Sequence, residues 1–399
     1  MTDIVTDAIK VSRLSGGPVL AAVQFFFTLS WTVYAIQLPG LLGKAGIALS
    51  WLPLLLMADQ LIFAMMDIAF GVMADKMTNG YRRLARLMIV LATVSAFAFL
   101  MLPILADISA GILLLVLGIW VFSASVIRAP TLVLLAKHAK LAQQQSLVIW
   151  YVAGIALASA LSPFLGLWMK GFDPRLPFVM SALSLLIAVI VLKRVLVVTP
   201  VLIESEPPRP ISFAGYLPLL LVLAIAGFAF QLHAFVNASA LYKLHATNET
   251  LPWLMPLLWV GFFAMLIGVG KLIKRFGMLA VAVSGVLLLA LASYAANSAS
   301  SIGVLIVLQM LCGAGWAMGF AGLMERAAAD GTRGAEGLFM GSFFAVTALS
   351  TLARIAFVSH WLADWKSSQF ILPAALLLTA GVIAAFYGRF RRATVDAQK

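Results

Sequence analysis

The stretch AGILLLVLGIWVFSASVIRAPTLVLL at residues 110–135 decides the fold, and Arg128 is its one charged residue. A helix needs roughly 20 apolar residues to cross the hydrocarbon core of a bilayer. This stretch is long enough, whereas a barrel strand would alternate in hydropathy over about ten residues. Across the 399 residues 63% are apolar and 11% are charged, against about 25% charged in soluble domains. The composition predicts an integral membrane protein and excludes a cytosolic enzyme, a nucleic-acid binder and a secreted disulfide scaffold.

Similar apolar runs occur along the whole chain, in two sets of six. They lie at 18–40, 49–74, 87–105, 110–135, 145–169 and 175–192, and then at 214–238, 252–273, 277–297, 301–324, 337–360 and 368–388. The segment between the sets contains Glu204, Glu206 and the Pro207-Pro208-Arg209-Pro210 stretch, which are typical of a polar linker. We therefore expect an all-α integral membrane fold of 12 transmembrane helices in two pseudo-symmetric six-helix bundles. The predicted parts are an N-terminal bundle at 1–192, a cytoplasmic linker at 193–213 and a C-terminal bundle at 214–399.

The basic residues alternate from loop to loop and so predict the orientation. With both termini in the cytoplasm, two basic residues lie in spans, five lie outside and the other 20 of the 27 lie inside, a strong positive-inside bias. The five outside are Lys44, Lys170, Arg175, Lys243 and Lys366. The net charge of +12 therefore indicates topology and contact with anionic lipids, with no nucleic-acid partner. We expect a multi-pass protein of a plasma membrane, the bacterial cytoplasmic membrane, with its first apolar run retained as a span because no signal peptide precedes it.

The two halves of the sequence repeat at equivalent places. Phe63-Ala64-Met65, near the end of the second run, recurs as Phe263-Ala264-Met265 near the end of the eighth. The segment 71–76 is matched by 270–275, where a glycine again begins a stretch that ends in charged residues. Internal repeats around a site at the membrane midplane are typical of secondary transporters.

The segment that follows the second run resembles the signature loop of the major facilitator superfamily. That pattern is roughly G-x-x-x-D-R/K-x-G-R-R/K, and here two extra residues precede its second glycine. The matching residues are Gly71, Asp75, Lys76, Gly80, Arg82 and Arg83. The resemblance implies a transporter of twelve helices, and its architecture covers the whole chain.

Weaker likenesses leave the branch of the superfamily open. Arg128 lies where the family carries an intramembrane arginine, although the usual Gln-Gly after it is replaced by Thr131-Leu132. The segment 158–167 resembles a degraded Gly-Pro motif of the family's antiporters, which favours efflux. The spacing of Asp67 and Asp75 is similar to that of sugar–cation symporters, which favours uptake.

The signature loop has a physical interpretation of its own. Gly71 removes a side chain where two helices pass closely. Asp75 can pair with Arg82 or Arg83, or it can cap the N-terminus of a neighbouring helix. The loop would then latch one conformation; the alternative is that its basic residues serve topology alone.

Four charged residues lie within the predicted spans: Asp59, Asp67, Arg128 and Arg354. Each costs roughly 2.5–3.5 kcal/mol at the bilayer centre unless it is paired or hydrated. Asp67 and Arg128 lie at similar depths in parallel spans, so we predict an ion pair with Asp67 as the site of reversible protonation. The alternative is a purely structural salt bridge between the second and fourth spans.

Asp59 and Arg354 lie in the outer halves of the second and eleventh spans. The resemblance implies that these two spans face each other, so the two residues are candidates for an outer gate. The alternative is that Arg354 snorkels to the outer interface.

By the same resemblance, spans 1, 4, 7 and 10 line a central cavity. Its polar and aromatic candidates are Gln24, Trp31, Tyr34, Gln37, Gln231, His233, Asn237, Gln309 and Trp316. His233 either titrates near neutral pH or hydrogen-bonds a neighbouring helix. Because few fixed charges face this region, an amphipathic or weakly charged solute fits better than a polyanion.

These patterns predict a secondary-active transporter of a small organic solute, coupled to protons, working by alternating access and functional as a monomer. Its partners are the solute, protons and the lipid bilayer, and its direction is left open. The sequence has no Walker motif and no grouping of metal ligands or nucleophiles, so we expect no ATP drive, no enzyme activity, no metal and no cofactor. The alternative is a non-transporting relative that acts in membrane assembly or sensing.

Overall fold

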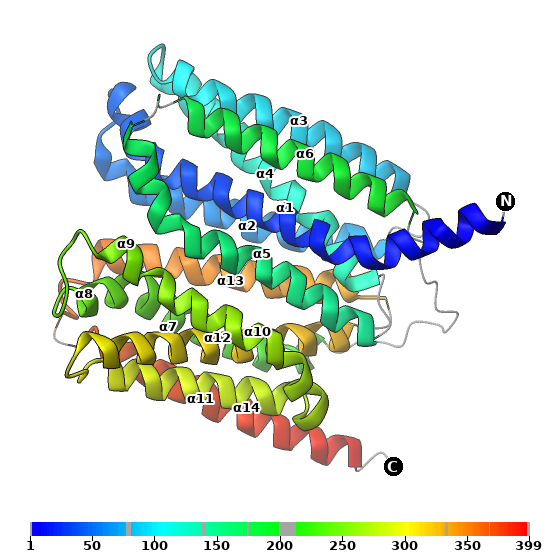
Figure 1. Cartoon of the computed structure of the whole chain (residues 1–399), viewed down its shortest axis with the longest axis vertical. Helices are drawn as coiled ribbons and strands as arrows, with labels where there is room; N and C mark the ends of the chain where they lie inside the picture. The colour runs from blue at the N-terminus through cyan, green and yellow to red at the C-terminus, as the bar shows by residue number, and fades with distance from the viewer. Residues whose placement is uncertain are drawn as a thin grey trace. The chain divides into compact units, whose positions relative to one another are not determined.

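The computed structural model describes residues 2–76, 81–137, 141–171, 173, 175–198, 213–331, 334–366 and 368–396, and these residues are largely helical (Figure 1). Ten of the described helices are long and apolar enough to cross a membrane, and Ala110–Ser125 and Leu372–Gly388 are shorter apolar helical segments at the places of two further predicted spans. Each of the twelve predicted spans is therefore a helix or a closely connected series of helices. In lipid a helix satisfies its own backbone hydrogen bonds, which is why long apolar runs fold in this way.

The chain divides into two compact units, which we describe separately. The first unit comprises Met1–Arg209 and Gly331–Ala345, and the second comprises Pro210–Asp330 and Val346–Lys399. The division after Arg209 falls inside the predicted linker at 193–213. Residues 331–345, which include the beginning of a late helix, belong to the first unit. The sequence predicted that all of 214–399 would lie in the C-terminal bundle.

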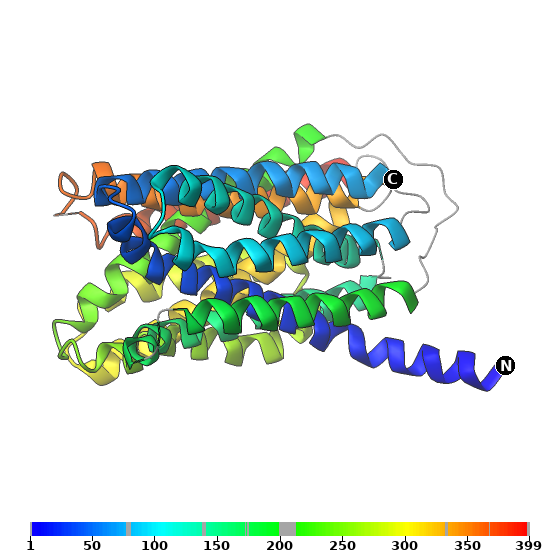
Figure 2. The same ribbon diagram turned by 90° about the horizontal axis from the view of Figure 1, so that it is seen from above.

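The helices of the first unit pack along one another in antiparallel and parallel pairs. They are α1 (Thr2–Lys44), α2 (Leu52–Lys76), α3 (Tyr81–Leu105), α4 (Ala110–Lys137), α5 (Leu141–Trp168) and α6 (Leu176–Val198). α1 packs against α5 and α6, α3 packs against α4 and α6, and α2 packs against α4. Both views show α3 and α6 side by side (Figure 1, Figure 2).

The second unit contains the remaining helices, together with most of α13. They are α7 (Leu217–Leu232), α8 (Ala238–Tyr242), α9 (Leu251–Leu254), α10 (Pro256–Phe276), α11 (Met278–Ala296), α12 (Ile302–Gly331), α13 (Glu336–His360) and α14 (Leu372–Asp396). A π-helical segment, His233–Asn237, joins α7 to α8 without ending the span. α14 packs against α7 and α11.

Glycines allow close helix contacts inside each unit, as small residues commonly do in membranes. A Cβ atom on Gly154 of α5 would overlap the backbone of Ala21 in α1. In the second unit, a Cβ atom on Gly313 of α12 would overlap the carbonyl of Leu258 in α10. These positions tolerate no side chain unless the helices separate.

Several helices extend beyond their predicted spans, α1 and α12 among them. α1 is helical from Thr2, whereas the predicted span begins at residue 18. α12 continues past the predicted end at residue 324 to Gly331, so Glu325 and Arg326 lie inside the helix and not in a loop. The apolar run ends at residue 324, but the helix does not, because packing can carry a helix beyond its apolar stretch.

Candidate functional site

Asp67 of α2 and Arg128 of α4, the predicted pair, lie together inside the first unit. Nη1 of Arg128 is 3.3 Å from Oδ2 of Asp67, and the Asp67 side chain is 1% exposed. The rings of Phe27, Phe63 and Phe344 surround the guanidinium at 5.8, 5.4 and 5.7 Å. Such a dry setting strengthens the attraction between the two charges, and the ring faces add favourable cation–π contacts.

The contact between these two residues is ionic in its geometry. Among the described residues, no group donates a hydrogen bond to Oδ2 of Asp67. Tyr151 of α5 also interacts with Arg128, so the guanidinium has a second neighbour besides the carboxylate. A proton on Asp67 would cancel the attraction without removing every contact of Arg128. The arrangement can therefore exchange between a charged pair and a neutral acid.

Asp59, nearer the other end of α2, has a different partner. The Tyr34 hydroxyl of α1 donates a hydrogen bond of 2.8 Å to Oδ2 of Asp59, and both residues are buried. The Tyr34 ring lies 5.1 Å from Trp31 and 4.6 Å from Trp120, centroid to centroid. Asp59 is thus held inside the first unit by a neutral donor and an aromatic cluster.

Arg354 of α13 lies in the second unit, against the span that begins with α7. Its Nε donates to Oε1 of Gln231 at 3.1 Å, and Nε2 of Gln231 donates to Oγ1 of Thr351 at 3.1 Å. The guanidinium carbon lies 5.3 Å from the centre of the Phe235 ring. Asp59 and Arg354 each have a partner within their own unit, and the gate between them stays a prediction.

The signature segment binds the beginning of α13 within the first unit. The backbone N–H groups of Gly337 and Leu338 donate to the two oxygens of Asp75 at 2.7 and 2.8 Å. A Cβ atom on Gly71 would overlap the carbonyl of Gly337, so the two helices touch through their backbones. Of the two roles considered for Asp75, this geometry is that of a helix N-terminal cap, where a carboxylate meets free N–H groups and the positive end of the helix dipole.

The rest of the signature segment is described only in part. Lys76 is exposed at the end of α2. Gly80 lies outside the described residues. Arg82 and Arg83 lie in α3, but their side chains are outside the described part of the structure.

The cavity candidates of the first unit are buried or half-buried along α1. Gln24 is 2% exposed, and Trp31 and Tyr34 belong to the aromatic cluster around Asp59. Nε2 of Gln37 lies 3.8 Å from the sulfur of Met169. These four residues therefore follow one helix of one unit.

The candidates of the second unit form mostly neutral contacts. Nε2 of His233 is 3.1 Å from Oε1 of Gln309, and both residues are buried. Asn237 donates to the backbone carbonyl of Gln369 at 2.7 Å. The Trp316 ring stacks on Phe230 with 4.3 Å between centroids and 9° between planes. His233 thus hydrogen-bonds a neighbouring helix, as one of its two interpretations expected.

The family model of the Major Facilitator Superfamily matches residues 20–351. The chain belongs to this superfamily. The human organic anion transporter MFSD10 shares 15% identity with it at a TM-score of 0.74, covering 92% of this chain and 98% of its own. A bacterial homologue of the iron transporter ferroportin, in its outward-facing state, shares 13% identity at a TM-score of 0.75, covering 94% and 100%. The E. coli fucose:proton symporter shares 14% identity at a TM-score of 0.66, covering 94% and 99%.

A comparison with curated proteins finds no match. The solved structures have the twelve-helix fold in common with this chain, and at these identities they show the fold alone. Membership of the superfamily confirms the resemblance predicted from the signature loop and makes the chain a multi-pass membrane protein of a transporter family, not of an enzyme family.

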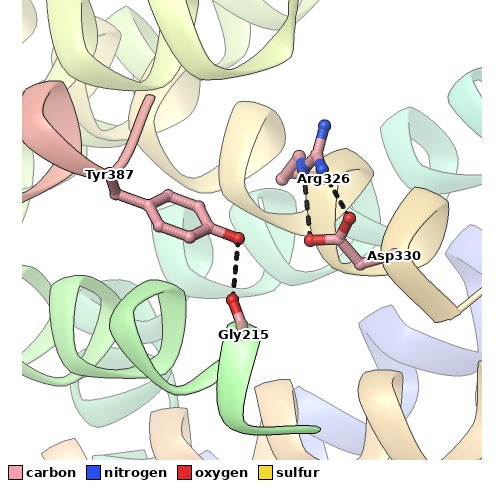
Figure 3. A network of polar contacts seen from close by, with 4 residues as sticks. All are labelled: Gly215, Arg326, Asp330 and Tyr387. Carbon is pink, nitrogen blue, oxygen red and sulfur yellow. Dashed lines mark hydrogen bonds and ion pairs between the residues drawn. The ribbon is translucent and has the colours of Figure 1, made fainter. Parts of the chain in front are cut away.

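A polar cluster at the end of α12 was not predicted from the sequence. Arg326 pairs with Asp330 at 2.6 Å, and the Tyr387 hydroxyl of α14 donates to the carbonyl of Gly215 at 3.1 Å (Figure 3). Glu325 beside them is 6% exposed. The opposite charges four residues apart, typical of a helix, were the available signal. It was missed because the predicted span ended at residue 324.

Proposed function

We propose that this superfamily member is a secondary-active transporter of a small organic solute, coupled to protons and working by alternating access. The observation that carries the proposal is the Asp67–Arg128 pair, buried among aromatic rings at 3.3 Å. Intramembrane charges of this kind are costly and mark ion or substrate pathways. The fucose:proton symporter shows that the shared fold can serve a protein named for proton coupling.

The pair would couple the proton to a conformational change by switching its own attraction on and off. With Asp67 ionised, α2 and α4 are held together by a charge pair in a dry interior. Protonation leaves a neutral acid beside Arg128, so the guanidinium becomes free to seek other partners. A ligand or a proton can shift a conformational equilibrium only through such a difference between the two states.

Asp75 would stabilise one of those states. Its carboxylate binds the first N–H groups of α13, and that contact must be broken if α2 and α13 separate. Gly71 permits the close approach on which the contact depends. We propose that the signature segment is a latch that opens once per transport cycle.

The proposal includes the setting of the protein. The protein would work as a monomer in a bacterial cytoplasmic membrane, and the positive-inside bias supports placing both of its termini in the cytoplasm. One proton that moves inward across 100–150 mV releases roughly 2.3–3.5 kcal/mol, enough for a solute gradient of about 50–350-fold. The drive is thus sufficient for either uptake or efflux.

The test is transport in sealed vesicles that contain the purified full-length protein. A panel of labelled anionic, neutral and cationic solutes is followed with and without an imposed pH gradient, at a membrane potential clamped by potassium and valinomycin. We expect at least one solute to move against its gradient only while the pH gradient lasts, and the sign of the effective gradient gives the direction. Protein-free vesicles and vesicles treated with a protonophore are the controls.

Indifference to every solute and to every ion gradient would contradict transport. It would favour the alternative of a membrane assembly or sensing protein. Transport that proceeds only down the solute's own gradient would leave the protein a transporter but remove the proton coupling.

A further inference from the structure

Arg354 differs from the other intramembrane arginine because its described unit offers it no negative charge. The second unit's acidic side chains within the described residues lie out of ion-pair distance of the Arg354 guanidinium, and Asp330 is paired with Arg326. These acidic residues are Glu249, Glu325, Asp330 and Asp364. Arg354 is therefore a half-buried cation that is held by neutral groups only.

The contacts of Arg354 fix its orientation and leave its outer edge available. Nε is used in the 3.1 Å hydrogen bond to Gln231, and Gln231 is itself held by Thr351. The Phe235 ring lies against one face of the guanidinium at 5.3 Å. Within the described residues no hydrogen bond uses Nη1 or Nη2. Four N–H donors in one plane thus remain for a ligand.

A planar pair of N–H donors matches the two oxygens of a carboxylate. Guanidinium–carboxylate contacts are frequently bidentate, and they are strong where water is scarce. An intramembrane arginine without a counter-ion costs free energy. A ligand that supplies a negative charge would offset that cost. A neutral solute could accept hydrogen bonds from the Nη groups, but it would leave the positive charge of Arg354 uncompensated.

We propose that Arg354 is the anion-binding residue of the transport site and that the solute is an organic monoanion with a carboxylate group. Gln231 is then a positioning residue, because it directs the guanidinium without needing to touch the solute. The inference rests on the proposed transport function and narrows its substrate class. The phosphate of an anionic lipid offers the same oxyanion chemistry, and the experiment has to distinguish that source from a soluble carboxylate.

The test compares carboxylates with their own primary amides as ligands of the purified full-length protein in a neutral detergent. The probes are the straight-chain acids from acetate to dodecanoate, benzoate, phenylacetate and indole-3-acetate, each with its amide. Thermal stabilisation is measured against probe concentration. We expect at least one carboxylate to stabilise the protein saturably, while its amide, which has the same shape, binds at least about tenfold more weakly.

The variants assign that binding to Arg354. Arg354→Gln is expected to weaken the carboxylate at least about tenfold, and Arg354→Lys, which keeps the charge and loses the planar fork, by less. Lys366→Gln removes a positive charge from an exposed loop and is the matched control, with no expected change. If Arg354→Gln does not fold, Arg354→Lys still tests the claim, because a point charge without the fork must bind more weakly.

Three results would overturn the proposal. One is the absence of stabilisation by every carboxylate, or equal stabilisation by the amides. Another is carboxylate binding that Arg354→Gln leaves unchanged, even if transport is altered, since that is what a gate role would give. The third is stabilisation by phosphatidylglycerol that depends on Arg354 and that no carboxylate displaces.

The same vesicles separate this proposal from the proposed function. Carboxylate binding through Arg354, in a protein that moves no solute of the panel across the membrane, supports the anion site and contradicts transport. Proton-driven movement of a neutral or cationic solute that is unaffected by Arg354→Gln supports transport and overturns the anion site.

Discussion

The two units differ in the partner that they provide for an intramembrane arginine. In the first unit Arg128 lies 3.3 Å from the carboxylate of Asp67. In the second unit Arg354 is bound by the neutral amide of Gln231 at 3.1 Å. We propose that a proton switches the charge pair of the first unit and that a ligand supplies the counter-ion of the cation in the second. A repeated fold does not imply repeated chemistry.

The same contrast holds at the ends of the matching helices α2 and α10. α2 carries Asp75, which binds the first turn of α13. At the equivalent place α10 carries Lys274, which is exposed. A helix N-terminus attracts a carboxylate and repels an ammonium group, so Asp75 can cap a helix N-terminus in this way and Lys274 cannot.

The largest expected effect comes from breaking the charge pair. Arg128→Met or Asp67→Leu alone leaves one uncompensated buried charge and should lower the free energy of unfolding by about 3–5 kcal/mol. The double variant removes both charges and should recover most of that loss. Arg354→Gln, in the other unit, should cost far less, since it leaves no unpaired charge behind.

Reversible unfolding in mixed micelles measures the four variants against the wild type. If the single variants at Asp67 and Arg128 lose no more unfolding free energy than Arg354→Gln, the proposed difference between the units is wrong.

The next effect is steric and should differ in sign between two glycines. Gly71→Ala places a Cβ atom against the Gly337 carbonyl and should destabilise the protein by about 1–3 kcal/mol. Gly268→Ala, on α10, meets no atom within 4 Å and should stabilise its helix by about 0.5–1 kcal/mol. Melting of the two variants in parallel checks both signs, and equal losses would argue against a special contact at Gly71.

A smaller effect is expected from the latch itself. Asp75→Asn replaces hydrogen bonds to a charged acceptor and should weaken the contact by about 1–2 kcal/mol. Hydrogen exchange of the peptide that contains Gly337 and Leu338 should then accelerate by about 5–30-fold. Lys274→Gln is the matched control at the end of α10. Unchanged protection of α13 in the Asp75 variant would show that the carboxylate does not hold it.

The smallest effect concerns the Tyr387 hydroxyl, whose hydrogen bond to Gly215 is drawn in Figure 3. Tyr387→Phe keeps the ring and removes the hydroxyl, and with it the hydrogen bond to the Gly215 carbonyl and the interactions with Arg326 and Asp330, so it should cost about 0.5–1.5 kcal/mol. Thermal unfolding of the variant against the wild type measures it. A loss as large as that of Arg128→Met would mean that this contact, and not the charge pair, dominates the polar energetics of the two units.

The fold was predictable because a long apolar run in lipid has one stable backbone structure. The depth of a charge was predictable too, since each helical residue advances about 1.5 Å. Asp67 and Arg128 lie at similar depths on this measure, which is why the sequence predicts their ion pair. The partners of Arg354 were not predictable. Hydropathy says nothing about which face of α7 meets α13, so Gln231 could be placed in a cavity list but not beside Arg354.

At the end of α12, hydropathy alone did not predict where the helix ends. Glu325, Arg326 and Asp330 look like a polar loop, but the helix continues through them because their side chains find partners or burial there. The π-helical segment at His233–Asn237 had no signal in the sequence pattern either, because one extra residue in a turn barely changes an almost continuous apolar run.

The central claim, that Asp67 carries the coupling proton, is tested most directly by Asp67→Asn in sealed vesicles. Two reactions of one solute are compared: accumulation driven by a pH gradient, and exchange of labelled for unlabelled solute at equal pH. The account predicts that accumulation is lost while exchange and solute affinity remain, because Asn mimics the protonated acid. Accumulation that persists in the Asp67→Asn protein at the wild-type level would contradict it.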